Sequence, residues 1–225
     1  MTIHGWASRP ALRLIFAIIT LVIIAMPIRL LGAPSGAERL QGFLSQLQTL
    51  QADFQQVLLD EKGAAQDQTS GQVYLSRPGR FRWDYKVPHP QIIVADGNQV
   101  WLYDVELSQV TVRTQATALA DTPAALLSSI APFEDSFEVK ELGEREDGSV
   151  WLLLTPRSGE EGSTGNFDGI SVGFSGEGEL QAMELKDSFG QTTRIRFSAI
   201  EHNPELDAEL FRFTPPPGVD VIQSQ

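Results

Sequence analysis

The sequence of 225 residues contains no cysteine and only three histidines. Without cysteine the chain has no disulfide bonds and no thiol after the leader to which lipid could be attached. His89 and His202, the two histidines beyond residue 37, lie far apart and form no pattern of catalytic bases or metal ligands. The glycine-rich stretch 159–165 lacks the Gly-Lys-Ser/Thr ending of a phosphate-binding loop. We therefore predict that the protein is not an enzyme and needs no metal or cofactor.

Long apolar runs are also missing, apart from residues 14–28 near the N-terminus. This run has about 15 residues, fewer than the ~20 that a membrane-spanning helix needs. It follows Arg9 and Arg13 and precedes small residues between positions 32 and 37. A basic start, a short apolar stretch and small residues are typical of a secretory signal peptide. An uncleaved membrane anchor is the alternative.

We predict a signal peptide over residues 1–37, with cleavage within 33–37. Residues 35–37 (SGA) offer small residues at both positions that the peptidase requires, and this cut would start the mature chain at Glu38. Ser35 and Glu38 are also spaced as a capping box for a following helix, which the same cut would destroy. Cleavage after Ala33 would place Pro34 first, which signal peptidases usually resist. The bond therefore stays open.

Positive charge is scarce in the remaining domain, residues 38–225. Residues 1–37 hold three arginines and no acidic residue, which leaves 14 basic against 29 acidic side chains and a net charge of −15. Such a charge repels nucleic acid and anionic membrane surfaces. About 188 residues make one domain with a sizeable core. An exported chain without cysteine fits the periplasm better than a disulfide-stapled extracellular role, and we expect a soluble periplasmic monomer that binds no nucleic acid.

Two periodicities organise the domain. An apolar stripe with spacings of three and four predicts an opening amphipathic helix of four turns, formed by Leu40, Phe43, Leu44, Leu47 and Leu50. The spacing then changes to two, with turn signals about every ten residues, including Asp96-Gly97 as a hairpin turn. Short loops between sequential strands predict an antiparallel meander in a mainly β, α+β fold: one curved sheet or barrel with accessory helices. The eleven predicted strands are 52–59, 71–77, 80–86, 91–95, 99–105, 108–114, 135–142, 149–155, 167–174, 180–186 and 192–200.

One segment interrupts the β pattern. Thr122 and Pro123 are typical of a helix N-cap and first helical position, and residues 124–131 are predicted to form a short helix that Pro132 ends. A helix of about nine residues is marginal alone and must pack to exist. Such a segment can act as a movable cover. Its buried face would consist of Leu126, Leu127 and Ile130.

Several strands carry more apolar area than a thin sheet needs. Phe81, Trp83 and Tyr85 share one face of strand 80–86, and other strands repeat the alternation. An ordinary packed core explains this as well as a cavity does, because alternation cannot separate the two. The candidate cavity-lining residues are Phe81, Trp83, Tyr85, Trp101, Ile170, Val172 and Phe174.

The position of Arg77 bears on the choice between a packed core and a cavity. Counting by twos from Val73 and Leu75 places it on their apolar face. An arginine directed into an apolar interior is costly unless its five donors find acceptors, which carbonyls at a helix end would supply. Alternatively, the strand ends at Ser76 and Arg77 reaches solvent. The pattern does not decide.

Four segments of the chain carry a resemblance to a known family: residues 51–56 (QADFQQ), 71–83 (GQVYLSRPGRFRW), 94–101 (VADGNQVW) and 211–216 (FRFTPP). Together with Thr122-Pro123 and the leucines that follow, they resemble the outer-membrane lipoprotein carrier family (LolA type). The resemblance spans essentially the whole mature chain in order. The Arg-Pro-x-x-Phe-x-Trp block is fairly specific and the Asp-Gly hairpin much less so.

The resemblance implies an incomplete antiparallel β-barrel over lid helices, with an internal hydrophobic cavity. It implies a periplasmic chaperone that takes acylated lipoproteins from an inner-membrane ABC transporter to an outer-membrane receptor. Arg77 matches a family arginine that holds the helical lid closed, with Leu126, Leu127 and Ile130 on that lid, and Phe81 matches a cargo-handling position. For Trp83 and Trp101 it implies a place in the lining without a named role. The acidic, glycine-rich loop 157–166 and the long leader depart from the family pattern.

Two other classes of function are weighed against this one. The first is a lipid-binding envelope-stress sensor of the same fold, although family relatives of that kind usually add a second domain. The second is an envelope hydrolase built on acidic pairs, which has no recognisable constellation behind it. The numerous acidic residues are more typical of a solvated surface.

Overall fold

The computed structural model describes residues 34–118, 123–129, 133–157, 167–187 and 189–223. Most of the predicted signal peptide lies outside these ranges, as do Thr122, Ile130 and Pro132 of the predicted short helix and the glycine-rich stretch 159–165. Over the described ranges, no helix is both long and apolar enough to cross a membrane.

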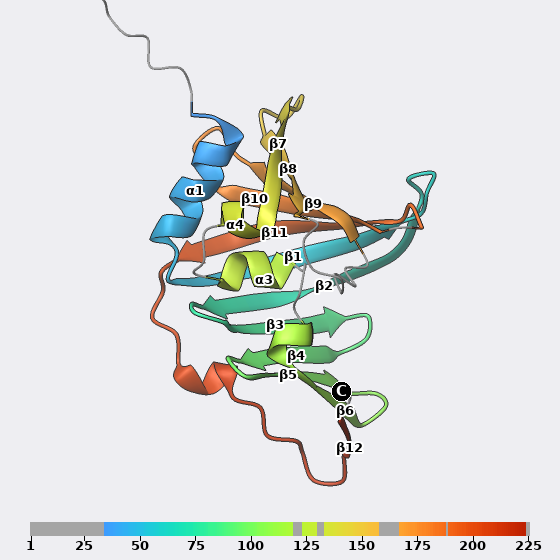
Figure 1. Ribbon diagram of the computed structural model, residues 1–225. Helices are drawn as coiled ribbons and strands as arrows, with labels where there is room; N and C mark the ends of the chain where they lie inside the picture. Colours follow the sequence, from blue (N-terminus) through green and yellow to red (C-terminus); the bar gives the residue numbers. More distant parts are fainter. Residues whose placement is uncertain (1–33, 119–122, 130–132, 158–166, 188, 224–225) are drawn as a thin grey trace, which may run out of the picture. The chain divides into compact units, whose positions relative to one another are not determined.

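Twelve strands form one sheet in the order β12-β6-β5-β4-β3-β2-β1-β11-β10-β9-β8-β7 (Figure 1). Two antiparallel meanders, β1 to β6 and β7 to β11, are joined where β1 pairs with β11. The edges β12 and β7 are not neighbours, so the sheet is open. The strands are β1 (Thr49–Leu59), β2 (Ala65–Ser76), β3 (Arg80–Val87), β4 (Gln91–Asp96), β5 (Gln99–Asp104), β6 (Gln109–Thr114), β7 (Phe137–Glu144), β8 (Val150–Pro156), β9 (Phe167–Phe174), β10 (Leu180–Asp187), β11 (Thr192–His202) and β12 (Asp220–Gln223).

The mainly β fold and all eleven predicted strands are confirmed. The Asp96-Gly97 turn joins β4 to β5 as expected. The Asp96 carboxylate accepts hydrogen bonds from the backbone of Asn98 and Gln99, both at 2.8 Å, and Gly97 has a φ of +104° that favours glycine. The twelfth strand was not predicted: β12 pairs in parallel with β6, which makes it the exception in an otherwise antiparallel sheet.

Helix α1 (Gly36–Gln46) begins with the predicted capping box. The Ser35 hydroxyl accepts from the Glu38 N–H at 3.2 Å, and the Ser35 N–H donates to the Glu38 carboxylate at 2.8 Å. Glu141 of β7 also accepts from the N–H groups of Gly36 and Ala37, at 3.1 and 3.0 Å. Three side chains thus satisfy the free N–H groups of the first turn.

The prediction of a four-turn helix was wrong at its C-terminal end. Helix α1 ends at Gln46, whose carbonyl accepts from the Asn203 side chain at 3.0 Å. Leu47 and Leu50 continue the apolar stripe but lie in the cap and in β1, where they are 3% and 2% exposed. A stripe shared by a helix and the next strand looks continuous in sequence.

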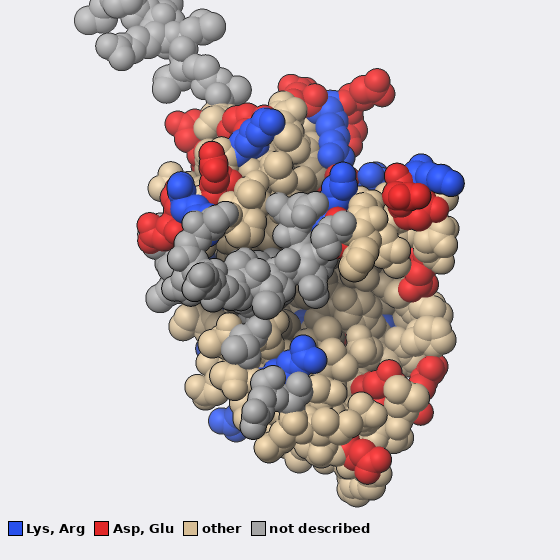
Figure 2. Space-filling view, turned by 45° about the vertical axis from the view of Figure 1, so that its right-hand side comes forward, with Lys and Arg blue, Asp and Glu red and all other residues tan. Residues whose placement is uncertain are grey.

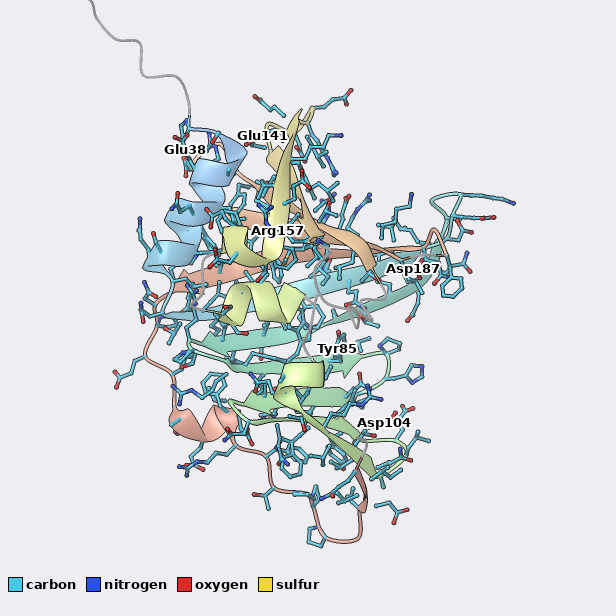
Figure 3. All side chains as sticks on the ribbon, viewed as in Figure 1. Glu38, Tyr85, Asp104, Glu141, Arg157 and Asp187 are labelled. Atoms are coloured by element: carbon cyan, nitrogen blue, oxygen red, sulfur yellow. The ribbon has the colours of Figure 1, made fainter. Side chains whose placement is uncertain are left out.

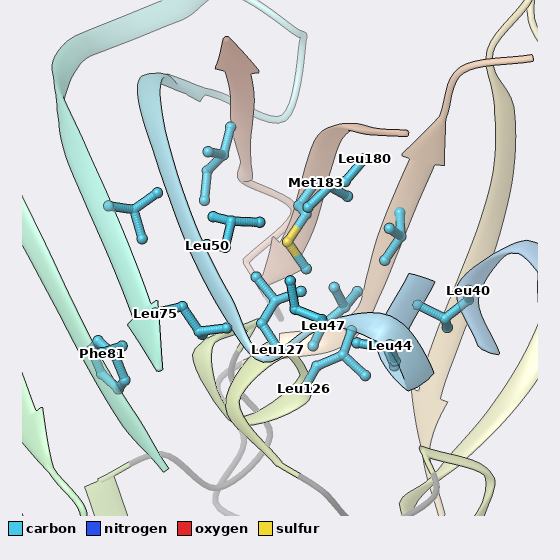
Figure 4. Close-up of a cluster of buried hydrophobic side chains, with 14 of the residues drawn as sticks. Leu40, Leu44, Leu47, Leu50, Leu75, Phe81, Leu126, Leu127, Leu180 and Met183 are labelled. Carbon is cyan, nitrogen blue, oxygen red and sulfur yellow. The ribbon is translucent and has the colours of Figure 1, made fainter. Parts of the chain in front are cut away.

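The helices and the inner face of the sheet share one core (Figure 4). Leu40, Leu44 and Leu47 face it from α1 and its cap, and Leu126 and Leu127 face it from α3 (Pro123–Ser128). Figure 1 shows α1, α3 and the four-residue helices α2 (Gln115–Ala118) and α4 (Phe133–Ser136) on the same side of the sheet. The sheet contributes Leu50, Leu75, Phe81, Leu180 and Met183, among others.

The C-terminal segment covers the other face of the sheet. After β11 the chain forms the 3₁₀ helix η1 (Ala208–Phe211) and then runs on to β12. The centroid of the Phe213 ring lies 5.8 Å from the ring centroid of Trp101 and 5.7 Å from that of Tyr103, and both of these residues are on β5. Aromatic packing therefore fixes this segment to the outer face.

Candidate functional site

A cavity of about 660 Å³ lies on the inner face of the sheet. Its volume falls within the range of roughly 300–1,000 Å³ that is usual for binding sites of small organic molecules. Strands β1, β3 to β6, β10 and β11 form the walls, and Ala118 of α2 and Ala124 of α3 complete them. Figure 2 shows a hollow bordered mainly by uncharged residues on this side of the molecule. The lining residues are Gln56, Phe81, Trp83, Tyr85, Ile93, Val100, Leu102, Thr111, Arg113, Ala118, Ala124, Leu185, Thr193 and Ile195.

The lining is mainly apolar, with a few polar groups. Tyr85 donates from its hydroxyl to the Gln56 side-chain oxygen at 3.3 Å, and burial raises the pKa of Tyr85 to about 12. The phenol therefore stays neutral at any physiological pH. Figure 3 labels Tyr85 on β3, beside α2 in that view. Thr111 and Arg113 lie on β6 at one side of the cavity, and Thr193 lies on β11.

Strand register explains which side chains reach the cavity. Trp83 pairs with Ile93, Ile93 with Leu102, and Leu102 with Thr111, so one row of side chains crosses four strands on one face. The next row runs through Phe81, Ala95, Val100 and Arg113. Ala95 in this row is fully buried in the core and does not border the cavity.

Helix α3 lies over one end of this lining. Leu126 and Leu127 are 3% and 4% exposed, and Leu127 and Ala124 face Phe81 and Trp83 across a second space of only about 10 Å³. This space is barely enough for one water molecule. The helix therefore fills the volume next to the main cavity almost completely.

Arg77 joins the C-terminal ends of two helices. Its guanidinium donates to the carbonyl oxygens of Leu44 and, at 3.3 Å, Leu47 at the end of α1, and to that of Ser129 just after α3. Carbonyls at a helix C-terminus lack partners within the helix and carry partial negative charge, so a cation is favourable there. Burial lowers the pKa of the Arg77 guanidinium from its ordinary value. The sequence left open whether Arg77 reaches solvent or binds carbonyls at a helix end, and in the structure it binds the carbonyls.

The turn after Arg77 also holds the C-terminal end of α3 to the sheet. The Gly79 N–H donates to the Ser128 carbonyl at 3.0 Å. The Gln115 amide donates to the Gly79 carbonyl at 2.6 Å and accepts from the Gly97 N–H at 3.0 Å. Sequence reasoning missed Gln115, because an amide just after a strand gives no signal of its own.

The predicted lining residues fall into three groups. Phe81, Trp83 and Tyr85 line the cavity. The prediction for Trp101 was wrong: Val100 and Leu102 line the cavity, so Trp101 lies on the opposite face, against Phe213. The predicted residues of β9 do not border the cavity and belong to the packed core, with Phe43 of α1 5.8 Å from Phe174. They are Ile170, Val172 and Phe174, each at most 1% exposed.

Several lining residues were not predicted. Gln56, Thr193 and Arg113 are polar, and the prediction of the lining named only apolar and aromatic residues. Their row partners Ile195, Leu185 and Val100 show that the face on which they lie turns inward. Only the register between distant strands, above all β1 with β11, places these residues at one site.

A family model and the curated relatives identify the same family. A family model described as outer membrane lipoprotein carrier protein LolA matches residues 45–214. An outer-membrane lipoprotein carrier protein from Dechloromonas aromatica (strain RCB) is 47% identical over 193 residues, which cover 86% of this chain and 90% of that protein. Another from Methylococcus capsulatus is 44% identical over 208 residues, covering 90% and 97%. The crystal structure of an uncharacterized conserved protein from Thermus thermophilus matches with a TM-score of 0.51 at 13% identity, covering 82% of this chain and 98% of that one, and supports the fold alone.

Proposed function

This chain belongs to the LolA family of outer-membrane lipoprotein carrier proteins, and from that premise we propose that it carries acylated lipoproteins with their acyl chains in the inner cavity. The observation that carries the proposal is the cavity of about 660 Å³, mainly apolar and partly closed by a short helix. The function is carriage and not catalysis. No nucleotide is needed at this site, because release from the donor membrane is driven elsewhere.

The physical need for such a carrier is large. Each CH₂ removed from water contributes about 0.8 kcal/mol, so a lipoprotein with several acyl chains does not cross an aqueous compartment unaided. The carrier must also release its cargo, and a cavity that bound too tightly would hold it. A cover that refills the apolar surface of the empty protein competes with cargo and lowers its net affinity.

We assign that competing role to α3. The side chains of Leu127 and Ala124 occupy the apolar surface next to Phe81 and Trp83, where acyl chains would otherwise extend, and Leu126 is buried in the same core. Arg77 steadies this closed arrangement by binding the end of α3 and the end of α1 at once. Ile130, the third predicted lid residue, lies outside the described residues.

The route of the cargo follows from the same premise. We propose that the mature protein works in the periplasm after removal of the N-terminal signal, receives lipoproteins from an inner-membrane ABC transporter, and passes them to a receptor at the outer membrane where one is present. Its strong negative charge opposes direct adsorption to anionic lipid. This favours delivery through protein partners.

The test is a pair of substitutions at neighbouring positions of β5. Leu102→Glu places a carboxylate in the cavity wall, whereas Tyr103→Glu places one on the outer face beside Phe213. A diacylated lipopeptide should bind the wild type, and Leu102→Glu should weaken it at least about tenfold, since an unpaired charge against acyl chains costs more than ~1.4 kcal/mol. Tyr103→Glu should change the dissociation constant little, and the peptide without acyl chains should not bind.

A second measurement uses the natural cargo. The mature protein is purified from its host, and bound molecules are identified by mass spectrometry. Acylated lipoproteins should co-purify with the wild type and be depleted from Leu102→Glu. Equal binding of the lipopeptide by both glutamate variants, or cargo without acyl chains, would refute carriage in this cavity.

A further inference from the structure

The three tryptophans of the described domain differ in one respect. Trp101 donates from its indole N–H to the Asp96 carboxylate at 3.2 Å, and Trp151 donates to the Ser149 hydroxyl at 2.6 Å. The indole nitrogen of Trp83 is buried, yet among the residues that the structure describes it has no hydrogen-bond partner. Trp83 as a whole is 7% exposed.

The groups described around Trp83 supply no acceptor for its indole N–H. Phe54 and Phe197 flank its ring at 5.0 and 6.3 Å between centroids. Trp83 lines both the cavity and the small space beneath α3, and that small space is bordered by apolar side chains throughout. An indole N–H can only donate. Its hydrogen bond therefore needs an acceptor that the described residues around it do not supply.

A buried donor without a partner is unusual in a folded protein, because most buried polar groups are paired. Phenylalanine would cover the same wall without a polar atom. Burying an unpaired N–H costs free energy in the closed form, so the indole is unfavourable there for stability alone. This cost is recovered if an acceptor reaches the nitrogen once the cavity is occupied.

We propose that the Trp83 N–H binds a carbonyl oxygen at the head of an acyl chain, in the ester that joins the chain to the glyceryl group of the cargo. The proposal rests on the proposed function and adds a polar contact to it. An ester carbonyl accepts a hydrogen bond, carries no charge and sits directly on an apolar chain, which suits a buried donor beside a small space that is bordered by apolar side chains. Ala124 and Leu127 lie beside the indole, so displacement of α3 gives the carbonyl access. The contact sets how far the acyl chain enters the cavity.

The test compares two synthetic lipopeptides with the same peptide and chain lengths, one with ester-linked chains and one with ether-linked chains that lack the carbonyl oxygens. Titration should give wild type a preference for the ester of about fivefold, the ratio that corresponds to roughly 1 kcal/mol for one neutral hydrogen bond. Trp83→Phe should bind both more weakly and show no preference. Trp101→Phe is the matched control: it loses an indole on the outer face and should keep the wild-type preference.

A spectroscopic measurement needs no variant. In ¹⁵N-labelled mature protein, the indole resonances of Trp83, Trp101 and Trp151 can be followed directly. The Trp83 N–H should move downfield with the ester lipopeptide and not with the ether, while the other two stay in place.

The outcomes separate the two proposals. An ester preference that Trp83→Phe retains, or equal binding of both lipopeptides by the wild type with no shift of the Trp83 resonance, overturns the carbonyl contact and leaves carriage intact. If the wild type binds neither lipopeptide, the proposed function itself fails.

Discussion

Replacing Arg77 with leucine should open the lid and tighten cargo binding. The substitution removes the hydrogen bonds from the guanidinium to Leu44 and Leu47 on the α1 side and to Ser129 on the α3 side. A hydrogen bond from a charged donor contributes about 1.5–3 kcal/mol, and because this site is partly open to solvent we take the lower end. The loss of ~1.5 kcal/mol on the α3 side shifts the balance of closed and open forms by about tenfold.

The remaining contacts of α3 limit the effect. Burial of Leu126 and Leu127 contributes about 1.5–3 kcal/mol each, and the Gly79 N–H still binds the Ser128 carbonyl. The helix is therefore expected to stay near the sheet and exchange more often, without unfolding. If only the open form admits acyl chains, the apparent dissociation constant should fall by up to the same factor of about ten.

Two measurements check this. Titration with a diacylated lipopeptide should show tighter binding by Arg77→Leu than by wild type, and transfer of loaded cargo to an acceptor should be slower. Arg80→Leu is the matched control, because Arg80 lies three residues away and contacts the Ser76 hydroxyl and the Phe211 ring of η1 instead of the ends of α1 and α3. A folded Arg77→Leu protein with wild-type affinity and normal transfer would refute the role assigned to Arg77.

Two further predictions concern stability. Burial alone would raise the pKa of the Glu184 carboxyl. Its hydrogen bonds with Arg145 and the charges of Arg145 and Arg194 nevertheless hold that pKa below its ordinary value. The stabilisation of the fold by ionised Glu184 is therefore present above the unfolded-state pKa and is lost as pH falls through the folded-state pKa. Urea unfolding should show that Glu184→Gln is less stable than wild type at pH 7 and that the gap shrinks toward pH 3, and a gap independent of pH would contradict this. Gly71→Ala should destabilise strongly, since its Cβ would lie 1.8 Å from the backbone oxygen of Asp84; a melting temperature unchanged from wild type would exclude that clash.

Much of the fold could be predicted because its strands carry their own signals. Alternation of apolar residues and turn residues such as Asp96-Gly97 identified eleven strands, and the spacing of Ser35 and Glu38 identified the start of α1. These are local features, decided by neighbours along the chain.

Features decided by distant partners were missed. Strand β12 has four residues and is held by parallel pairing with β6, about a hundred positions earlier in the chain. The end of α1 escaped for a related reason, because Leu50 belongs to the helical stripe by spacing and to β1 by pairing with Leu75. In both cases tertiary contacts override the local pattern.

The cavity shows the same limit most clearly. Alternation on β5 correctly places Val100 and Trp101 on opposite faces, yet it does not say which face is the inner one. The register answers this, since Val100 pairs with Ala95 and Ala95 with Phe81, which turns the aromatic Trp101 outward. Grouping residues by size and aromatic character therefore chose the wrong side of this strand. The hydrogen bonds of the two indoles are consistent with that division. The outer Trp101 donates to Asp96 within the protein, whereas the inner Trp83 has no acceptor among the described residues, which is the observation behind the proposed carbonyl contact.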